Sequence, residues 1–210
     1  MKREEGGQGP GLASMARNAM LTFGRQFLAG FLRIGALLLV ARMLGPAGAG
    51  AYAVALIIPT VLAQVLNFGL PTANVYFLAS GRLALAQLRS SSFIVAGLGS
   101  VLGLAIGGWA IVVHGGAWFP GAPKPMLLTM LSVLPFALLF GLITSLFQAA
   151  EDFRTFNALV LVEPLLTLVF LSGLWAAGAG TLATAAAATL TAYAVASIAA
   201  VALSLCKFGT

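Results

Sequence analysis

Charged side chains are scarce in this sequence. They make up 8% of the 210 residues, whereas 60% of the residues are hydrophobic and the mean hydropathy is +1.04. Roughly a quarter of the residues in a soluble domain are charged, so this chain has too little charge for a water-soluble surface. Disorder is excluded as well, because disordered chains are poor in apolar residues and rich in charge. The uncharged runs exceed the ~18 residues that mark a membrane-spanning helix, so the sequence predicts an integral membrane protein.

The sequence also lacks cysteine pairs and catalytic motifs. The single cysteine, Cys206, excludes an intrachain disulfide and a cysteine-based metal site. The net charge of +6 does not indicate nucleic-acid binding, since there is no dense basic stretch and no aromatic-basic stripe. Without a phosphate loop, an aspartate cluster or a Gly-x-Ser-x-Gly elbow, the sequence predicts neither enzymatic activity nor a cofactor. The polar start and the arginines in the first apolar run predict that there is no signal peptide.

Six apolar segments are long enough to cross a bilayer, because ~20 helical residues at about 1.5 Å per residue span a ~30 Å hydrocarbon layer. Gly45 and Pro46 separate the first two segments, since glycine and proline break helices. Gly69 and Pro71 predict a kink within the second segment. The predicted fold is an all-α bundle of six transmembrane helices, at about residues 19–41, 50–78, 92–113, 126–149, 156–176 and 182–205.

Lysine and arginine residues beside these segments predict the orientation of the bundle, because cytoplasmic loops are enriched in them. With the N-terminus inside, seven basic residues lie in cytoplasmic segments and only Arg42 and Lys124 lie outside. This count predicts that both termini are cytoplasmic, with residues 1–18 as a cytoplasmic segment and residues 19–206 as one transmembrane lobe. The seven cytoplasmic residues are Lys2, Arg3, Arg17, Arg82, Arg89, Arg154 and Lys207.

Small residues recur at every fourth position along the third and sixth segments. Such a stripe allows another helix to approach closely. We expect both stripes to pack against helices of the same chain rather than to form a homodimer face. The stripes consist of Gly99, Gly103 and Gly107, and of Thr184, Ala188, Ala192, Ala196 and Ala200.

Two arginines inside the first apolar segment are the most informative charges. Arg25 lies about six residues into the segment, ~9 Å from the cytoplasmic boundary, where a long side chain can snorkel to the interface. Arg33 lies ~12 Å further along, too deep for snorkelling. An arginine at mid-membrane costs roughly 2.5–3.5 kcal/mol on insertion scales. Arg33 therefore requires a partner in the bundle or a water-filled cavity.

Glu163 is the only acidic residue within a predicted span. Counting residues from the cytoplasmic boundary places it ~10 Å deep, level with Arg25, and we expect these two to form a buried ion pair. Gln64 lies at a similar depth on the second span, and Asn67 lies on nearly the same helix face. Arg33 is then left without an acidic partner, which suits an anionic substrate; the alternative is a hydrogen-bonded structural arginine. The candidate substrate-binding residues are Arg25, Arg33, Gln64 and Asn67, and Glu163 is the candidate ion-pair or ion-coupling residue.

Three short segments resemble one family of membrane transporters. Residues 41–53 (ARMLGPAGAGAYA) resemble the R-x-L-G-P-x-x-x-G-x-Y junction between the first two helices of bacterial polysaccharide flippases of the O-antigen type. These flippases belong to the multidrug/oligosaccharidyl-lipid/polysaccharide exporter superfamily. Residues 67–73 (NFGLPTA) are similar to the family's F-G-L-x-x-A kink on the second helix. Residues 147–154 (FQAAEDFR) resemble its cytoplasmic connection between the fourth and fifth helices.

The resemblance covers essentially the whole chain and implies a multi-pass protein of the bacterial inner membrane. Such flippases have two six-helix lobes around a central cavity, so the chain resembles the N-terminal lobe alone. A C-terminal lobe on a missing segment or a second chain is then an implied partner. The implied activity is movement of undecaprenyl-diphosphate-linked oligosaccharide from the inner to the outer leaflet by alternating access. It implies Arg25 and Arg33 as contacts for the diphosphate and Glu163 as a proton or cation site.

Other functions remain as alternatives. A multidrug exporter of the same superfamily would exchange a cationic drug for Na⁺ or H⁺, but its cavity should be acidic, whereas two arginines and one glutamate are expected here. A membrane enzyme of lipid-linked sugar assembly would require an Asp or His cluster at one membrane face, and none is seen. The third alternative is a non-transporting scaffold or a truncated half-gene.

Overall fold

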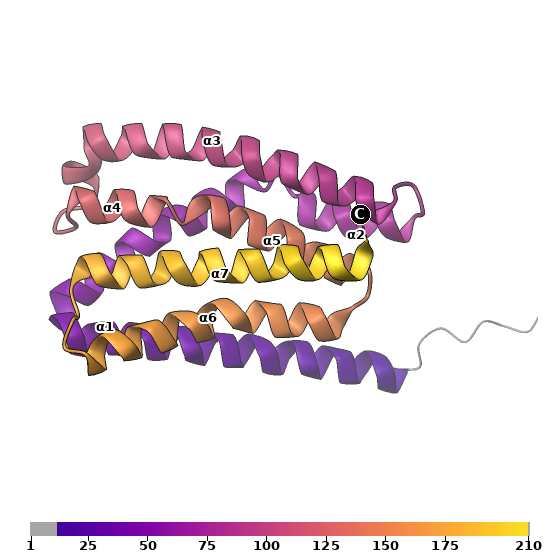
Figure 1. The fold of residues 1–210 in the computed structure, drawn as a ribbon, viewed down its shortest axis with the longest axis horizontal. Helices are drawn as coiled ribbons and strands as arrows, with labels where there is room; N and C mark the ends of the chain where they lie inside the picture. The colour runs from indigo at the N-terminus through magenta and orange to yellow at the C-terminus, as the bar shows by residue number, and fades with distance from the viewer. Residues whose placement is uncertain (1–11, 210) are drawn as a thin grey trace, which may run out of the picture.

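The structure, a computed structural model, describes residues 12–209, and the regular elements in this range are all α-helices. Figure 1 shows an elongated bundle whose helices run roughly along its long axis. The predicted all-α fold is confirmed for these residues. Most of the predicted N-terminal segment, residues 1–18, lies outside the described range, and the first helix already begins at Leu12. The helices are α1 (Leu12–Leu66), α2 (Leu70–Ala79), α3 (Leu85–Trp118), α4 (Lys124–Leu131), α5 (Leu134–Ala149), α6 (Phe153–Ala176) and α7 (Leu182–Phe208).

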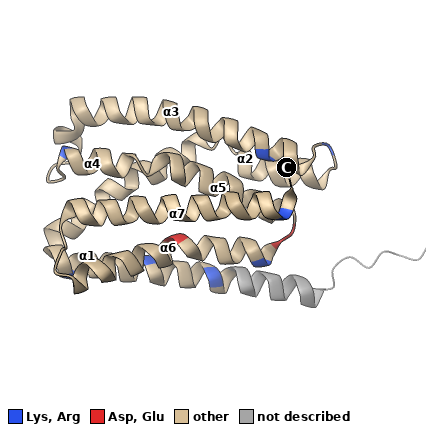
Figure 2. Ribbon diagram, in the orientation of Figure 1, with Lys and Arg blue, Asp and Glu red and all other residues tan. Residues whose placement is uncertain are grey.

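The surface and the helix lengths are those of a membrane protein. Large apolar side chains point outward, and Leu98, Val101 and Ile198 are 68%, 70% and 66% exposed. Charged residues are few and lie mostly toward the two ends of the bundle (Figure 2). The chain is therefore a multi-pass membrane protein. Five helical segments are long and apolar enough to cross a bilayer: Phe23–Ala79, Leu85–Trp118, Lys124–Ala149, Phe153–Ala176 and Leu182–Phe208.

Helix α1 consists of two arms joined at Gly45, as the sequence predicted. Gly45 has φ 73° and ψ 177°, a backbone conformation that is strained for residues with a side chain. Pro46 follows directly and cannot donate a backbone hydrogen bond. In Figure 1 the first arm runs beside α6, and the chain then turns back across the bundle toward α2. The break at Gly45 therefore brings two stretches of α1 into one bundle.

A second break separates α1 from α2, at the predicted kink. Phe68 and Gly69 both have positive φ, 49° and 70°, and the side-chain oxygen of Asn67 accepts the Gly69 N–H at 2.8 Å. Beyond the break α2 is fixed in the core, because the fully buried amide of Asn74 donates to Ser92 Oγ of α3 and Ser145 Oγ of α5. The second arm of α1 and the anchored α2 are thus separate helices.

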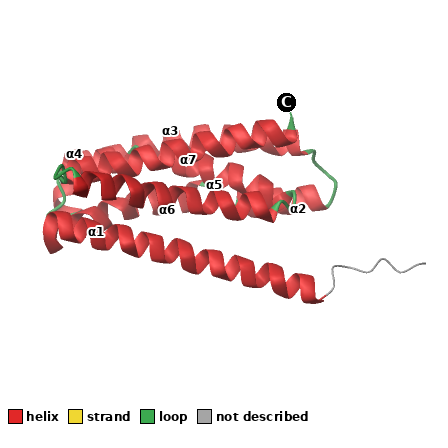
Figure 3. Ribbon diagram, turned by 60° about the horizontal axis from the view of Figure 1, so that its bottom comes forward, coloured by secondary structure: helices red, strands yellow, loops and turns green. Residues whose placement is uncertain are grey.

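The fourth predicted span is interrupted, contrary to the expected continuous helix over residues 126–149. It is divided into α4 and α5 by Ser132 and Val133. The Val133 N–H donates to the carbonyl of Met130, three residues earlier, which is a tighter turn than in an α-helix. Pro135 lies in the first turn of α5, where its missing N–H is tolerated. The loops between helices are short and lie near the ends of the bundle (Figure 3).

Both small-residue stripes pack within the chain, as predicted. A methyl group at Gly99 would lie 3.2 Å from the Leu66 carbonyl oxygen of α1 and 3.3 Å from the Leu138 side chain of α5. One at Gly103 would collide with Leu134 and Leu66. The absence of side chains therefore allows α3 to contact α1, α4 and α5 closely. On α7, four residues of the stripe are buried: Ala188, Ala192, Ala196 and Ala200.

This packing predicts a position-specific effect of valine on α3. Gly103→Val adds atoms where Leu134 and Leu66 already fill the space, whereas a methyl group at Gly97 meets nothing within 4 Å. The intrinsic cost of valine in a helix is the same at both sites, so Gly97→Val is a matched control. We expect Gly103→Val to destabilise the protein by about 2 kcal/mol more than Gly97→Val, since overpacking costs roughly that much. Thermal unfolding in detergent, followed by circular dichroism, measures the difference; equal shifts would contradict the packing.

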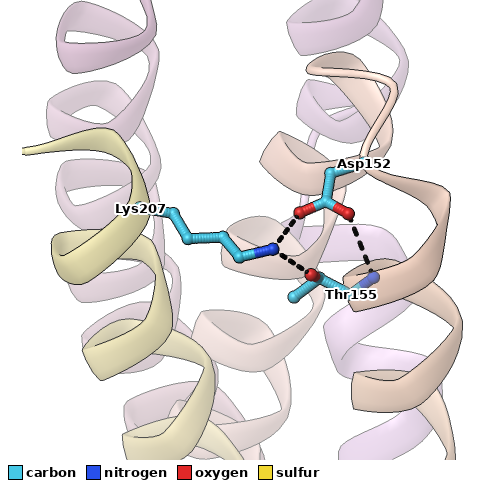
Figure 4. Close-up of polar contacts among 3 residues, drawn as sticks. All are labelled: Asp152, Thr155 and Lys207. Carbon is cyan, nitrogen blue, oxygen red and sulfur yellow. Dashed lines mark hydrogen bonds and ion pairs between the residues drawn. The ribbon is translucent and has the colours of Figure 1, made fainter.

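Polar contacts tie the last helix to the α5–α6 turn. Lys207 Nζ donates to Asp152 Oδ2 and to Thr155 Oγ1, and the Thr155 N–H donates to Asp152 Oδ1 at 3.2 Å (Figure 4). The hydrogen bonds from Lys207 and Thr155 hold the pKa of the Asp152 carboxyl below its ordinary value. The stabilisation is therefore present above the unfolded carboxyl pKa and is lost as the pH falls through the lower folded value. Arg89 Nη1 also donates to the Gly209 carbonyl at this end.

Candidate functional site

A cavity of about 670 Å³ lies between both arms of α1 and helices α2, α5, α6 and α7. Four of the five candidate residues line it: Arg33, Gln64, Asn67 and Glu163. They come from three predicted spans that the fold brings side by side. Much of the remaining lining is apolar, including Ile34, Leu37, Leu56, Ile57, Leu138 and Phe140. The site is thus a mostly hydrophobic pocket with a few convergent polar groups.

Arg33 and Glu163 form an ion pair at this cavity. Arg33 Nη2 lies 3.2 Å from Glu163 Oε2, and Thr167 Oγ1 donates to Glu163 Oε1 at 3.3 Å. The two partners differ in burial, because the Arg33 side chain is 61% exposed and that of Glu163 only 7%. The prediction that Arg33 lacks an acidic partner is therefore wrong. Arg33 is the exposed member of the pair and Glu163 is the buried one.

The predicted pair of Arg25 and Glu163 is also wrong, because the two helices are aligned differently. The first arm of α1 and α6 lie side by side, and the guanidinium carbon of Arg25 lies 4.6 Å from the ring centroid of Phe156. Phe156 is in the first turn of α6, so Arg25 is level with the start of this helix. Glu163 is two turns further along and therefore meets Arg33. Counting each span from its own assumed boundary missed this offset.

Arg33 keeps hydrogen-bonding capacity on the cavity side. A guanidinium has five N–H donors, and among the described residues the Arg33 side chain donates to Glu163 alone. The exposed edge of the group is therefore available to an acceptor. The charges of Arg33 and Glu163 cancel, so the cavity is electrically balanced rather than basic as predicted.

Gln64 and Asn67 line the same cavity from the second arm of α1. The Gln64 side chain is exposed at the cavity, and Asn67 is half-buried. The Asn67 oxygen is used by the Gly69 N–H, so its amide nitrogen is the group that remains for another partner. Both residues present neutral polar groups that suit hydroxyl-rich molecules more than ions.

Several hydroxyl groups at the cavity were not predicted from the sequence. Tyr52 and Thr189 share a buried hydrogen bond of 2.7 Å between α1 and α7, and both line the cavity. Tyr193 and Thr167 line it as well and are buried. The available signal was a polar side chain inside an apolar span, which needs a partner at membrane depth. No sequence pattern, however, pairs Tyr52 with a residue 137 positions away.

The described side chains show no metal site, and the comparisons with known proteins give no further information about the cavity. Among the side chains that the structure describes, residues 23–209, no group of three or more His, Cys, Asp or Glu could hold a metal ion. No protein-family model matches the chain, and comparisons with curated proteins and with solved structures find no match either. The family resemblance therefore rests on the sequence motifs alone.

Proposed function

We propose that this chain is the N-terminal lobe of a flippase that moves lipid-diphosphate-linked oligosaccharide across the bacterial inner membrane. The observation that carries the proposal is the guanidinium of Arg33, which is exposed at the cavity and held by a buried carboxylate. A cation at this depth is costly unless it faces a cavity or a partner. A diphosphate offers several anionic oxygens to a planar guanidinium, which binds such groups in a bidentate manner.

The proposed topology has six crossings with both termini in the cytoplasm. The reversal at Gly45 supports counting the two arms of α1 as separate crossings. Four basic residues lie at element ends that meet at one end of the bundle, where Lys207 contacts the α5–α6 turn and Arg89 contacts Gly209. This clustering supports a cytoplasmic assignment for that end. The four residues are Arg82, Arg89, Arg154 and Lys207.

The proposed mechanism begins with the Arg33–Glu163 pair, which satisfies the guanidinium while the cavity holds no substrate. The diphosphate competes with Glu163 for Arg33, and the amides of Gln64 and Asn67 bind sugar hydroxyls. Once Arg33 turns to the diphosphate, Glu163 is a buried carboxylate whose remaining partner is the Thr167 hydroxyl. A buried unpaired carboxylate takes up a proton or a cation. Substrate binding is thereby linked to an ion gradient.

A cation exporter of the same superfamily is the second candidate. It is favoured by the position of Arg25, which lies outside the cavity and leaves one cation and one anion there. The cavity therefore does not repel a cationic drug as strongly as two arginines would.

Deleting the gene in cells that produce this chain tests the proposal. We expect lipid-diphosphate-linked glycan to accumulate on the inner leaflet and the surface glycan to disappear, because translocation is blocked after synthesis. Restoration by the full chain on a plasmid is the control, and glycan is measured on intact cells and in lipid extracts. Unchanged surface glycan with increased sensitivity to cationic dyes would favour the exporter. Unchanged surface glycan together with unchanged dye sensitivity would contradict both transport functions. The non-transporting scaffold would then be the remaining alternative.

A further inference from the structure

Arg25 lies outside the cavity, at the seam between the first arm of α1 and α6. Its guanidinium lies over the ring of Phe156, and its Nε and Nη1 atoms are buried without a hydrogen-bond partner among the described residues. A cation–π contact satisfies the face of the guanidinium but not the N–H groups in its plane. Buried donors on a charged group are costly to leave unpaired. The seam therefore requires an acceptor that these residues do not supply.

Asn157, at the same level of the bundle, has an unpaired hydrogen-bond acceptor, whereas Arg25 has unpaired donors. It follows Phe156 directly on α6, and its side-chain oxygen is buried and unpartnered. The alignment of the two helices is fixed by Arg25 over Phe156 and by Arg33 beside Glu163. Asn157 is therefore level with Arg25. At this level of the bundle, Arg25 lacks a hydrogen-bond acceptor and the side-chain oxygen of Asn157 lacks a donor among the described residues.

We infer that this seam, formed by Arg25, Phe156 and Asn157, binds the headgroup of a phospholipid. The phosphate accepts hydrogen bonds from Arg25, and the ammonium of ethanolamine or a hydroxyl of glycerol donates to Asn157. A choline headgroup has no N–H or O–H donor and satisfies only the arginine. The seam thus recognises a headgroup in which a phosphate diester lies next to a hydrogen-bond donor.

The position of the seam fits this ligand. It lies at the first turn of α6, beside the helix end that Asp152 caps. Phe156 is the fourth residue of the apolar span Phe153–Ala176, so the seam lies at the end of a span, where headgroups are expected. Arg33 is eight residues further along α1, ~12 Å away, so the two arginines serve different sites. The inference does not depend on the transported substrate.

Native mass spectrometry of the purified full chain with added lipids tests the site. Phosphatidylethanolamine and phosphatidylglycerol should bind about tenfold more tightly than phosphatidylcholine, because a missing donor leaves the Asn157 oxygen unpaired. Arg25→Gln should weaken both preferred lipids about tenfold, and Asn157→Leu should remove the preference over phosphatidylcholine. Arg25→Lys, which keeps the charge, should retain part of the binding. Arg154→Gln, an exposed basic residue in the same turn, is the control and should change binding by less than about twofold.

Three outcomes would overturn lipid binding at this site. Equal binding of all three lipids to the wild type and to Arg25→Gln would mean that an ordered water molecule completes the seam. Displacement of lipid by inorganic phosphate, without headgroup preference, would assign the same atoms to a free anion. Equal losses in Arg154→Gln and Arg25→Gln would indicate general attraction to the basic end. Melting temperatures of the variants separate loss of binding from loss of folding.

Discussion

Replacing Arg33 with glutamine is expected to abolish glycan export. The substitution removes the one cation that lines the cavity among the described residues, and with it the proposed charge-assisted hydrogen bonds to the diphosphate. Each such bond contributes roughly 1.5–3 kcal/mol, so losing two of them weakens substrate binding by at least about a hundredfold. The measurement is surface glycan in cells whose own gene is replaced by the variant, with the amount of protein in the membrane determined in parallel.

The controls for Arg33→Gln separate charge from folding. Arg33→Lys keeps the charge but loses the planar donor pair, so partial export is expected. The double variant Arg33→Gln/Glu163→Gln removes the unpaired carboxylate and should be stable but inactive. Arg42→Gln, an exposed arginine next to the Gly45 turn, should export normally. Normal export by Arg33→Gln would remove this residue from the substrate site and disprove the proposed mechanism.

A double-mutant cycle on Arg33 and Glu163 is expected to show strong coupling. Arg33→Gln leaves a buried carboxylate unpaired, which is destabilising, whereas Glu163→Gln leaves an arginine that is already largely exposed and costs less. The double variant should recover much of the loss. Because Arg33 is screened on its exposed side, we expect a coupling energy of about 1–2 kcal/mol rather than the larger value of a fully buried pair. Unfolding in detergent measures the four free energies.

The matched control for this cycle pairs Arg25 with Glu163. Arg25 contacts Phe156 and not the carboxylate, so Arg25→Gln and Glu163→Gln should be additive to within about 0.5 kcal/mol. Coupling in this control and additivity in the first cycle would show that the helices are aligned as counting from the span ends predicts. The comparison therefore tests the register of α1 and α6 directly.

Local signals in the sequence predicted the helix breaks well. Glycine followed within two residues by proline marks where α1 turns and where α2 begins, because both residues act on the backbone of their own segment. The exception is the α4–α5 break, where Pro135 lies within a continuous apolar run. A single proline changes the mean hydropathy of such a run very little, so hydropathy alone does not reveal the break. Hydropathy thus identified the apolar segments more reliably than their interruptions.

The partners of the polar residues could be predicted only in part. Membrane depth indicated that Arg33 needs a partner and that Glu163 is the only acid available within a span. It did not indicate which arginine meets the acid, because a shift of two helical turns between α1 and α6 is set by packing along the whole seam. The Leu168 side chain, which would lie 3.7 Å from a methyl group placed at Gly35, is part of that packing, and no local pattern encodes it. Long-range pairs such as Tyr52 and Thr189 require the tertiary structure.

The two left-handed glycines at the ends of the second arm of α1 have a mechanical consequence. Gly45 and Gly69 flank a rod of helix, and a methyl group at either position would meet no atom within 4 Å. Side-chain packing at the glycines themselves therefore does not enforce these conformations, and at Gly69 the N–H is held by the Asn67 side-chain oxygen. Beyond the second joint, the Asn74 amide fastens α2 to the core. Rotation at these two glycines would leave every helical turn of the second arm intact, but it would have to break the Tyr52–Thr189 hydrogen bond and the packing of Leu66 against α3.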